Sequence, residues 1–276
     1  MVARVKKDQS RSVPTQAALA EVHDLYERAV QDPQTEVRFV SNKFKTLRGR
    51  QATTLREDFG GTGIFSLAWA RSRKERTAVS VDLDGPTQLW GMEHRVAKAP
   101  SHVQERVRFD RSNVLEGVGA PVDVAVAFNF SYWIFKTRAE LRRYFEVVHN
   151  SLVEDGVLFL DAFGGLDVPQ VDENRLEHED FTYIWEQRRY DALSHDFECA
   201  ISFEFADGSE ISSAFSYSWR LWSLVEIREL LEEAGFSKVN LYWERNDADG
   251  EGTGRFYLPK TADNEHVWWT YIAAEK

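Results

Sequence analysis

The 276-residue sequence predicts an α/β protein whose mostly parallel sheet carries helices on both faces. Short apolar segments alternate with amphipathic helical segments from residue 51 to residue 163. A glycine-rich turn, Gly60-Gly61-Thr62-Gly63, separates the first apolar segment from a helical one. A strand, a glycine turn and a helix start together make a site where backbone N–H groups can meet a bound group. Tight turns also use glycine for steric reasons alone, so this turn by itself leaves both interpretations open.

Composition narrows the class of protein. The hydrophobic share of 43% and the charged share of 29% are typical of a globular chain, and no apolar stretch approaches the length of a membrane span. A net charge of -11 disfavours a nucleic-acid partner, because phosphate neutralisation needs a basic face. The single cysteine, Cys199, rules out a disulfide framework and suits a reducing cytoplasm. Met1–Pro14 has no apolar run and is expected to be a flexible, solvated tail rather than a secretory signal.

Two amphipathic helices are expected before the glycine turn. The first spans Thr15–Gln31, and its apolar stripe consists of Leu19, Val22, His23, Tyr26 and Val30. The second spans Glu36–Leu47, with a stop at Gly49; its stripe consists of Val37, Val40, Phe44 and Leu47. These helices could cover the opening of the turn, so residues 1–50 are expected to form a tail and a helical lid.

Alternating strands and helices follow from residue 51. The expected strands are Thr53–Glu57, Thr77–Asp82, Val107–Asp110, Val122–Asn129 and Val157–Phe163. The expected helices are Ile64–Arg71, Pro86–Ala99 and Arg138–Leu152, the last of which opens with the capping box Thr137-Arg-Ala-Glu140. This alternation predicts right-handed crossovers and a ligand site at the carboxyl ends of the strands.

The pattern changes after Gly164-Gly165. Period-2 alternation at 181–185, 201–205 and 211–219, with the turn signal Asp207-Gly208, predicts an antiparallel insertion over 164–222. A helix then begins at the capping box Ser223-Leu-Val-Glu226 and ends at Gly235. Two final strands, Val239–Glu244 and His266–Ala273, are joined by the Asp/Gly-rich stretch Asn246–Gly254. No helix fits between them, so they are expected to be antiparallel.

Two side chains are placed to hold a nucleoside. Asp82 ends the second strand 19 positions after Gly63, which is about the spacing at which a carboxylate accepts the hydroxyls of a ribose. Asn113 follows the third strand and could pair with an adenine edge, or could simply support a turn. Asp84 is a second carboxylate, although its place before Gly85-Pro86 favours a helix-start role.

In this order the motifs resemble those of the class I S-adenosylmethionine-dependent methyltransferases. The matching segments are Glu57-Asp-Phe-Gly-Gly61-Thr62-Gly63, Val79-Ser-Val-Asp82, Asn113-Val-Leu, Val122-Asp-Val-Ala-Val-Ala-Phe128-Asn129 and Leu231-Glu-Glu-Ala-Gly235-Phe236. The similarity runs from about Gln51 to the C-terminus. It implies a Rossmann-like, mostly parallel seven-stranded sheet with an antiparallel last strand. Residues 51–276 would form the methyltransferase domain, with 164–222 as a substrate cap.

The resemblance also implies a role for each matching residue toward S-adenosylmethionine and its product S-adenosylhomocysteine. Glu57 and the turn would line the methionine and ribose, Asp82 would hold the ribose hydroxyls, and Phe128 and Asn129 would face the reactive methyl group. The full set of implied cofactor-binding residues is Tyr26, Glu57, Gly61, Thr62, Gly63, Asp82, Leu83, Asn113, Val114, Phe128 and Asn129. Leu83 would pack on adenine, and Tyr26 would close over the cofactor or pack in the core. Phe59 stands where the family has its first glycine, and altered packing is expected there.

The residues that would contact the methyl acceptor are predicted from the aromatic segments. Tyr132 follows the fourth strand and is the candidate catalytic residue, with a packing role as the alternative. The candidate substrate-binding residues are Tyr132, Trp133, Tyr217, Trp219 and Arg220. A structural salt bridge is the alternative for Arg220. The seven histidines show no paired ligand spacing, so no metal is expected.

Methyl transfer to a small or medium-sized acceptor by in-line displacement is therefore the expected function. A nicotinamide-dependent oxidoreductase is one alternative, but Ser66 stands where that motif has its third glycine or alanine. A non-catalytic, methyltransferase-like binding domain is the other alternative. The acceptor atom, any general base and the oligomeric state stay open.

Overall fold

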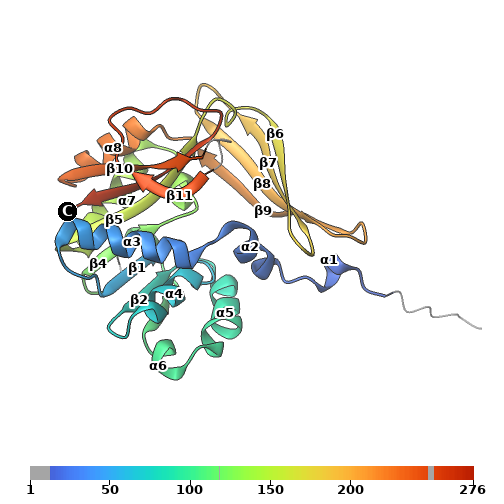
Figure 1. Ribbon diagram of the computed structural model, residues 1–276, viewed down its shortest axis with the longest axis horizontal. Coiled ribbons are helices and arrows are strands. Elements are labelled where there is room, and N and C mark those ends of the chain that lie inside the picture. Colours follow the sequence, from blue (N-terminus) through green and yellow to red (C-terminus); the bar gives the residue numbers. More distant parts are fainter. Residues whose placement is uncertain (1–12, 118, 248–251) are drawn as a thin grey trace, which may run out of the picture.

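The computed structural model describes residues 13–117, 119–247 and 252–276 (Figure 1). Residues 1–12 of the expected N-terminal tail and residues 248–251 of the expected connection between the last two strands lie outside this range. Within it the chain folds into two sheets, one of eight strands and one of four, with helices packed mainly on the larger sheet.

The larger sheet has the strand order β11-β10-β12-β5-β4-β1-β2-β3. Its strands are β1 (Thr54–Asp58), β2 (Thr77–Val81), β3 (Val107–Asp110), β4 (Val122–Ala127), β5 (Leu152–Gly164), β10 (Lys238–Asn246), β11 (Gly252–Tyr257) and β12 (Trp268–Glu275). β1 to β5 pair in parallel, whereas β12 is antiparallel to both of its neighbours, β5 and β10. The expected Rossmann-like sheet with an antiparallel last strand is thus confirmed.

Strand β11 adds an eighth, edge strand to the seven that were predicted. It pairs antiparallel with β10, and Phe256 on it packs against Phe39 and Tyr271 at ring-centroid distances of 5.3 and 4.8 Å. The Asp/Gly-rich composition around residue 250 hid this strand, because such residues are depleted in strands.

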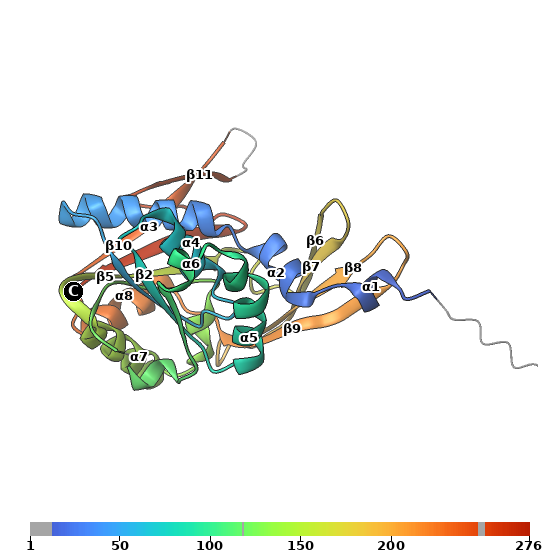
Figure 2. The same ribbon diagram turned by 90° about the horizontal axis from the view of Figure 1, so that it is seen from below.

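Helices cover both faces of the larger sheet, as expected (Figure 2). One face carries α3 (Pro33–Arg48) and α4 (Ile64–Ser72), and their buried side chains share a core with β1, β4 and β5. The opposite face carries α7 (Arg138–Ser151) and α8 (Leu224–Glu233). The shorter helices are α5 (Gly85–His94), η1 (Val96–Lys98), α6 (Ser101–Gln104), η2 (Val114–Glu116) and η3 (Ser131–Ile134).

The helix starts follow their capping residues. Asp32 accepts the N–H of Thr35 and precedes Pro33, which needs no N–H partner at the first helical position. Both predicted capping boxes form, at the starts of α7 and α8. Gly49 ends α3 in the left-handed conformation, with φ 69°, as its position predicted.

The first N-terminal helix is a correction, because the chain forms two short helices instead of one. These are α1 (Gln16–Leu19) and α2 (Val22–Val30), separated by extended backbone at Ala20 and Glu21. A tertiary contact holds α1 separately: the Gln16 N–H donates to the Asp207 carboxylate at 2.8 Å, which ties α1 to the turn of a distant hairpin. The buried face also differs, since Leu25 is buried whereas Leu19 is exposed.

The four-stranded sheet is the predicted antiparallel insertion. Its strands, in spatial order, are β6 (Asp172–Glu177), β7 (Thr182–Tyr190), β8 (Asp196–Glu204) and β9 (Glu210–Arg220). The predicted turn at Asp207-Gly208 joins β8 to β9, with Gly208 at φ 77°. Strand β6 was not predicted, because all of its residues are exposed and it carries no apolar alternation. Figure 1 shows this sheet extending to one side of the main body, with α1 and α2 beside it.

Candidate active site

The glycine turn joins β1 to α4 at the point where the strand order reverses. β1 pairs with β2 on one side and with β4 on the other, which makes its carboxyl end the switch point where open α/β sheets bind ligands. Gly63 caps α4 at φ 69°, and a Cβ there would lie 2.6 Å from Cζ of Phe109. Glycine suits this position because its left-handed backbone disfavours a side chain, and a Cβ would in addition displace the Phe109 ring of β3.

Phe59 adopts the backbone conformation that usually favours glycine. Its φ is 58°, and its ring packs against Phe135 and Tyr144 with centroid distances of 6.1 and 5.8 Å. A left-handed conformation costs a non-glycine residue about 1–2 kcal/mol. The aromatic contacts offset this cost, so the turn keeps its shape although the expected glycine is missing.

Asp82 lies just after the end of β2 and bonds to the glycine turn. Its carboxylate accepts the N–H of Gly61 at 2.8 Å and the N–H of Asp84 at 2.9 Å. It is only partly buried, and each carboxylate oxygen keeps a second lone pair that a ribose hydroxyl could use. Asp84 itself accepts the N–H of Thr87 as the N-cap of α5, which is its predicted helix-start role.

Three residues of the implied cofactor-binding set, Leu83, Asn113 and Val114, differ in accessibility. Leu83 is 62% exposed beside Asp82 and is free to receive an aromatic ring. Asn113 caps η2 by accepting the N–H of Leu115 at 3.0 Å, so the alternative turn role is present. Val114 is buried in the core, and its carbonyl accepts from Arg56 at 2.8 Å. The Val114 side chain therefore has no open route to a ligand.

A small cavity of about 20 Å³ adjoins the glycine turn, bounded in part by Gln31, Glu36, Glu57, Phe128 and Asn129. Its polar atoms are mainly acceptors: Gln31 Oε1 is buried without a partner, and Glu57 accepts the N–H of Ser66 at 3.0 Å. Burial raises the pKa of Glu57 to about 7. Such a lining fits the ammonium and sulfonium groups of S-adenosylmethionine. The space holds about one water, so a methionine tail enters only if the lining side chains make room for it.

A much larger cavity of about 700 Å³ lies beyond the carboxyl ends of β4 and β5. Helix α3 and strand β12 form one side of it, and the four-stranded sheet forms the other. Glu36 and Asn129 line both cavities, so the two spaces meet at these side chains. Cavities of this size accommodate compact organic molecules.

Asp161 fixes the backbone of Asn129 and Phe130 at the floor of the large cavity. Its carboxylate accepts the N–H groups of Asn129 and Phe130 at 2.8 and 3.0 Å, and both of these residues are left-handed, with φ 55° and 57°. Two consecutive strained residues of this kind persist only where the surroundings hold them, and they cluster at functional sites. Burial raises the pKa of Asp161 to about 7. The sequence reasoning missed Asp161, although a lone carboxylate inside the apolar segment Val157–Phe163 was an available signal.

Glu36 on α3 is the second carboxylate that the sequence reasoning missed. It is 8% exposed, and no side chain among the described residues bonds to its carboxylate. Burial, followed by the charges of Asp161, Glu57 and Asp32, raises its pKa to about 8. The signal was again available, because Glu36 lies four positions before Val40 on the apolar stripe of its helix.

Three of the predicted aromatic residues line the large cavity: Tyr26, Tyr217 and Trp219. Tyr217 and Trp219 stack with their centroids 4.4 Å apart. Tyr26 packs on Phe215 at 4.7 Å, and burial raises the pKa of Tyr26 to about 12. Strand β7 adds Tyr183 and Trp185, which were not predicted as site residues.

The remaining acceptor-side candidates lie elsewhere and need correction. Tyr132 is fully buried and donates to the backbone carbonyl of Asp161 at 2.8 Å, which is the packing alternative. Trp133 is fully buried against Phe163, with 4.9 Å between centroids. Arg220 pairs with Glu226 at 2.8 Å, which is the structural alternative, and is absent from the described lining of the cavity.

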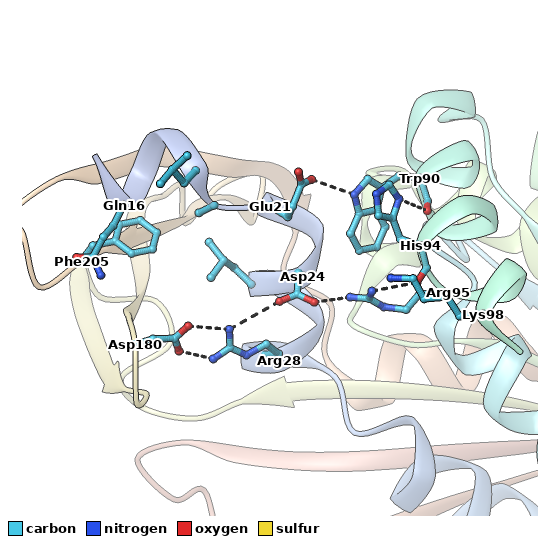
Figure 3. Close-up of a pocket in the computed structure, with 13 residues that line it drawn as sticks. Gln16, Glu21, Asp24, Arg28, Trp90, His94, Arg95, Lys98, Asp180 and Phe205 are labelled. Atoms are coloured by element: carbon cyan, nitrogen blue, oxygen red, sulfur yellow. Dashed lines mark hydrogen bonds and ion pairs between the residues drawn. The ribbon is translucent and has the colours of Figure 1, made fainter. Parts of the chain in front are cut away.

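Helices α1 and α2, called the N-terminal strap (residues 16–30), connect the glycine turn to the four-stranded sheet. Glu27 accepts from the Thr62 hydroxyl and from Arg95, both at 2.6 Å. Asp24 lies between Arg28 and Arg95, and Arg28 also pairs with Asp180 (Figure 3). A second cleft of about 440 Å³ borders these residues. Since its arginines are already ion-paired, this cleft is a weaker candidate site than the large cavity.

Two further properties concern only the described part of the chain. No group of three or more histidine, cysteine, aspartate or glutamate side chains is arranged to hold a metal ion. Likewise, none of the helices there has the length and apolar character needed to span a bilayer.

Comparison with known proteins identifies the fold. No protein-family model and no curated protein matches the sequence significantly. Among solved structures, an S-adenosylmethionine-dependent methyltransferase from Clostridium acetobutylicum matches with a TM-score of 0.67 and 16% identity over 91% of this chain and 96% of that chain. An amino pentose methyltransferase from Micromonospora echinaspora matches with a TM-score of 0.64 and 15% identity over 93% and 98%. A sugar N-methyltransferase from Streptoalloteichus matches with a TM-score of 0.59 and 19% identity over 95% and 96%. The chain thus has the fold of the class I S-adenosylmethionine-dependent methyltransferases.

Proposed function

We propose that this chain is an S-adenosylmethionine-dependent methyltransferase that acts on a compact small-molecule acceptor. The observation that carries the proposal is the junction of the two cavities. A cofactor at the glycine turn and an acceptor in the 700 Å³ cavity would meet at Glu36 and Asn129, which line both spaces. The solved structures of similar fold include enzymes for an amino pentose and for a sugar, which supports an acceptor of this size.

The cofactor would be held by residues on both sides of the turn. Asp82 would accept the ribose hydroxyls, Leu83 would cover the adenine, and Glu57 with Gln31 would accept from the ammonium group. When bound, S-adenosylmethionine supplies a methyl carbon on a cationic sulfur. The protein's part is to align the acceptor and to exclude water, and the largely apolar walls of the cavity suit that task.

The N-terminal strap would serve as the lid of this site. It contributes Tyr26 to the cavity wall and Glu27 to the glycine turn, so it contacts both ligand spaces. Residues 164–222 would form the substrate cap, because their strands supply four aromatic side chains of the cavity wall, Tyr183, Trp185, Tyr217 and Trp219. The buried, free Cys199 suits a reducing cytoplasm as the place of action.

A dinucleotide-dependent oxidoreductase is less well supported by the charges at the turn. The Gly61 N–H is already bonded to Asp82, and the Thr62 hydroxyl is bonded to Glu27. A pyrophosphate in this position would meet two carboxylates instead of free donors. The uncharged ribose and the ammonium group of S-adenosylmethionine suit these acceptors.

Isothermal titration with S-adenosylmethionine and S-adenosylhomocysteine tests the proposal. We expect micromolar binding of both, and Asp82→Ala should weaken it about tenfold to a hundredfold, because hydrogen bonds to a charged acceptor are lost. Asp155→Ala is the matched control, since Asp155 pairs with Arg50 at the amino end of β5. A folded wild-type chain that gives no heat with either compound would contradict the proposal.

A further inference from the structure

The large cavity has an unbalanced charge. Its described lining contains three carboxylates, Asp32, Glu36 and Asp161, and no lysine, arginine or histidine. Asp32 accepts the N–H of Thr35, and Asp161 accepts two backbone N–H groups. None of these partners is a cation, so the lining residues do not neutralise the negative charge inside the cavity.

Glu36 is a buried carboxylate that lacks a bonding partner among the described residues. It is more than nine-tenths buried, it lines the cavity, and its carboxylate has no bonding partner among the described residues. The charged groups that face it, Asp161, Glu57 and Asp32, carry the same sign, and the nearby Tyr271 is neutral. A carboxylate in such surroundings is costly unless a cation or a donor reaches it. A cationic ligand would supply the missing partner.

The aromatic wall favours the same ligand. Tyr217 and Trp219 stack at 4.4 Å, and Trp185 lies 6.2 Å from Trp219 by centroid. Aromatic faces attract ammonium groups, and the attraction strengthens when water is excluded. An anion in the same cavity would meet both the negative ring faces and the carboxylates. The charges and ring faces of the lining therefore favour a compact cation.

We infer that the methyl acceptor is a compact amine without a phosphate or carboxylate group, and that Glu36 binds it as a cation and takes its proton. This inference rests on the proposed function. Once Glu36 holds the proton, the freed lone pair on nitrogen forms the new N–C bond. The C–S bond breaks with its electron pair left on sulfur, so the positive charge passes from sulfur to nitrogen. The raised pKa of Glu36 suits proton transfer near neutral pH.

Wild-type selectivity is the first test, and it requires no variant. The probes are cyclohexylamine, cyclohexanol and cyclohexyl phosphate, which share a cyclohexyl ring and differ in charge. Calorimetry at pH 7, without cofactor, should show the amine binding at least tenfold more tightly than the alcohol, and no binding of the phosphate. Binding of the phosphate as tight as that of the amine would overturn the inference.

Glu36→Gln is the second test, because it removes the charge at constant size. Its affinity for cyclohexylamine should fall at least tenfold, while its affinity for cyclohexanol stays unchanged. Glu229→Gln makes the same exchange on the exposed face of α8 and should change neither affinity. A folded Glu36→Gln protein that binds the amine as tightly as wild type would remove Glu36 from this role.

Titration with S-adenosylhomocysteine separates this inference from the proposed function. If S-adenosylhomocysteine binds but the protein shows no preference for the amine, the assignment of the acceptor is wrong. The proposal of methyl transfer is then unaffected. If the protein prefers the amine but binds neither S-adenosylmethionine nor S-adenosylhomocysteine, the proposed function is wrong. The assignment of the amine as a methyl acceptor then fails as well.

Discussion

At the start of the glycine turn, Phe59 keeps a left-handed backbone while its ring packs against Phe135 and Tyr144. Phe59→Ala and Phe59→Gly both remove the ring, but only alanine still has to occupy φ 58° with a Cβ. We expect Phe59→Gly to be the more stable of the two by about 1 kcal/mol. Urea denaturation of both variants measures the difference. Equal stabilities would show that the backbone at Phe59 carries no strain.

At this scale, sequence patterns predicted residues whose positions follow from strand and turn geometry. Asp82 was predicted to lie beside the glycine turn because a typical number of residues separates such a turn from the end of the next strand, and its carboxylate accepts the Gly61 N–H there. Glu36 and Asp161 were missed because each lies in an apolar segment, where a lone carboxylate departs from the expected pattern. Tyr132 was misplaced because the sequence shows that a residue follows β4 but not which way its side chain points.

At the scale of elements, two arginines hold the N-terminal strap, and Arg95 is the more buried of the two. Arg95, whose side chain is 20% exposed, pairs with Glu27 and Asp24, whereas Arg28 pairs with Asp180 in a more exposed position. Arg95→Ala should weaken the docking of α2 by about 2 kcal/mol, because charge-assisted bonds to a buried partner are lost. Arg28→Ala should cost less than about 1 kcal/mol. Hydrogen exchange of residues 22–30 reports both values, and equal protection in the two variants would contradict this ranking.

Helices and strands with strong periodicity were predicted, and those shaped by tertiary contacts were not. The capping boxes placed the starts of α7 and α8, and Asp207-Gly208 placed the β8–β9 turn. The start of α1 is bonded to Asp207, which lies 191 positions from its partner Gln16. Local patterns carry no information about such a contact. Strands β6 and β11 were not predicted for a related reason: their pairing with neighbouring strands, and not an apolar alternation, defines them.

At the scale of the whole molecule, Glu36 links global stability to pH. Burial raises its pKa in the folded chain to about 8 from the ordinary 4.5, so ionised Glu36 penalises the folded state increasingly as the pH rises between these limits. Glu36→Gln should therefore match wild type near pH 5 and exceed it in stability at pH 8. The difference should grow by at most about 1.4 kcal/mol for each pH unit in this interval. Urea denaturation from pH 5 to pH 8, with Glu229→Gln as control, tests this, and a gap that is constant across pH would contradict it.

The order of strands and helices predicted the larger sheet, because βαβ connections leave few topologies. The placement of the second sheet was not predictable in the same way. It depends on contacts such as that of Leu25 with Phe181 and Phe203, which join segments more than 150 positions apart. The large cavity between the sheets, where we propose that the acceptor binds, is a product of that placement.

Tyr26 and Glu27 are neighbours on one turn of α2, yet Tyr26 borders the large cavity and Glu27 holds the glycine turn. A rigid helix cannot release one of these contacts and keep the other undisturbed. If the proposed function is correct, we expect exchange of a molecule at the turn to disturb the wall of the large cavity, and a molecule bound in that cavity to delay the exchange. Steady-state kinetics should accordingly follow an ordered sequence, with the methyl donor first to arrive and its demethylated form last to leave.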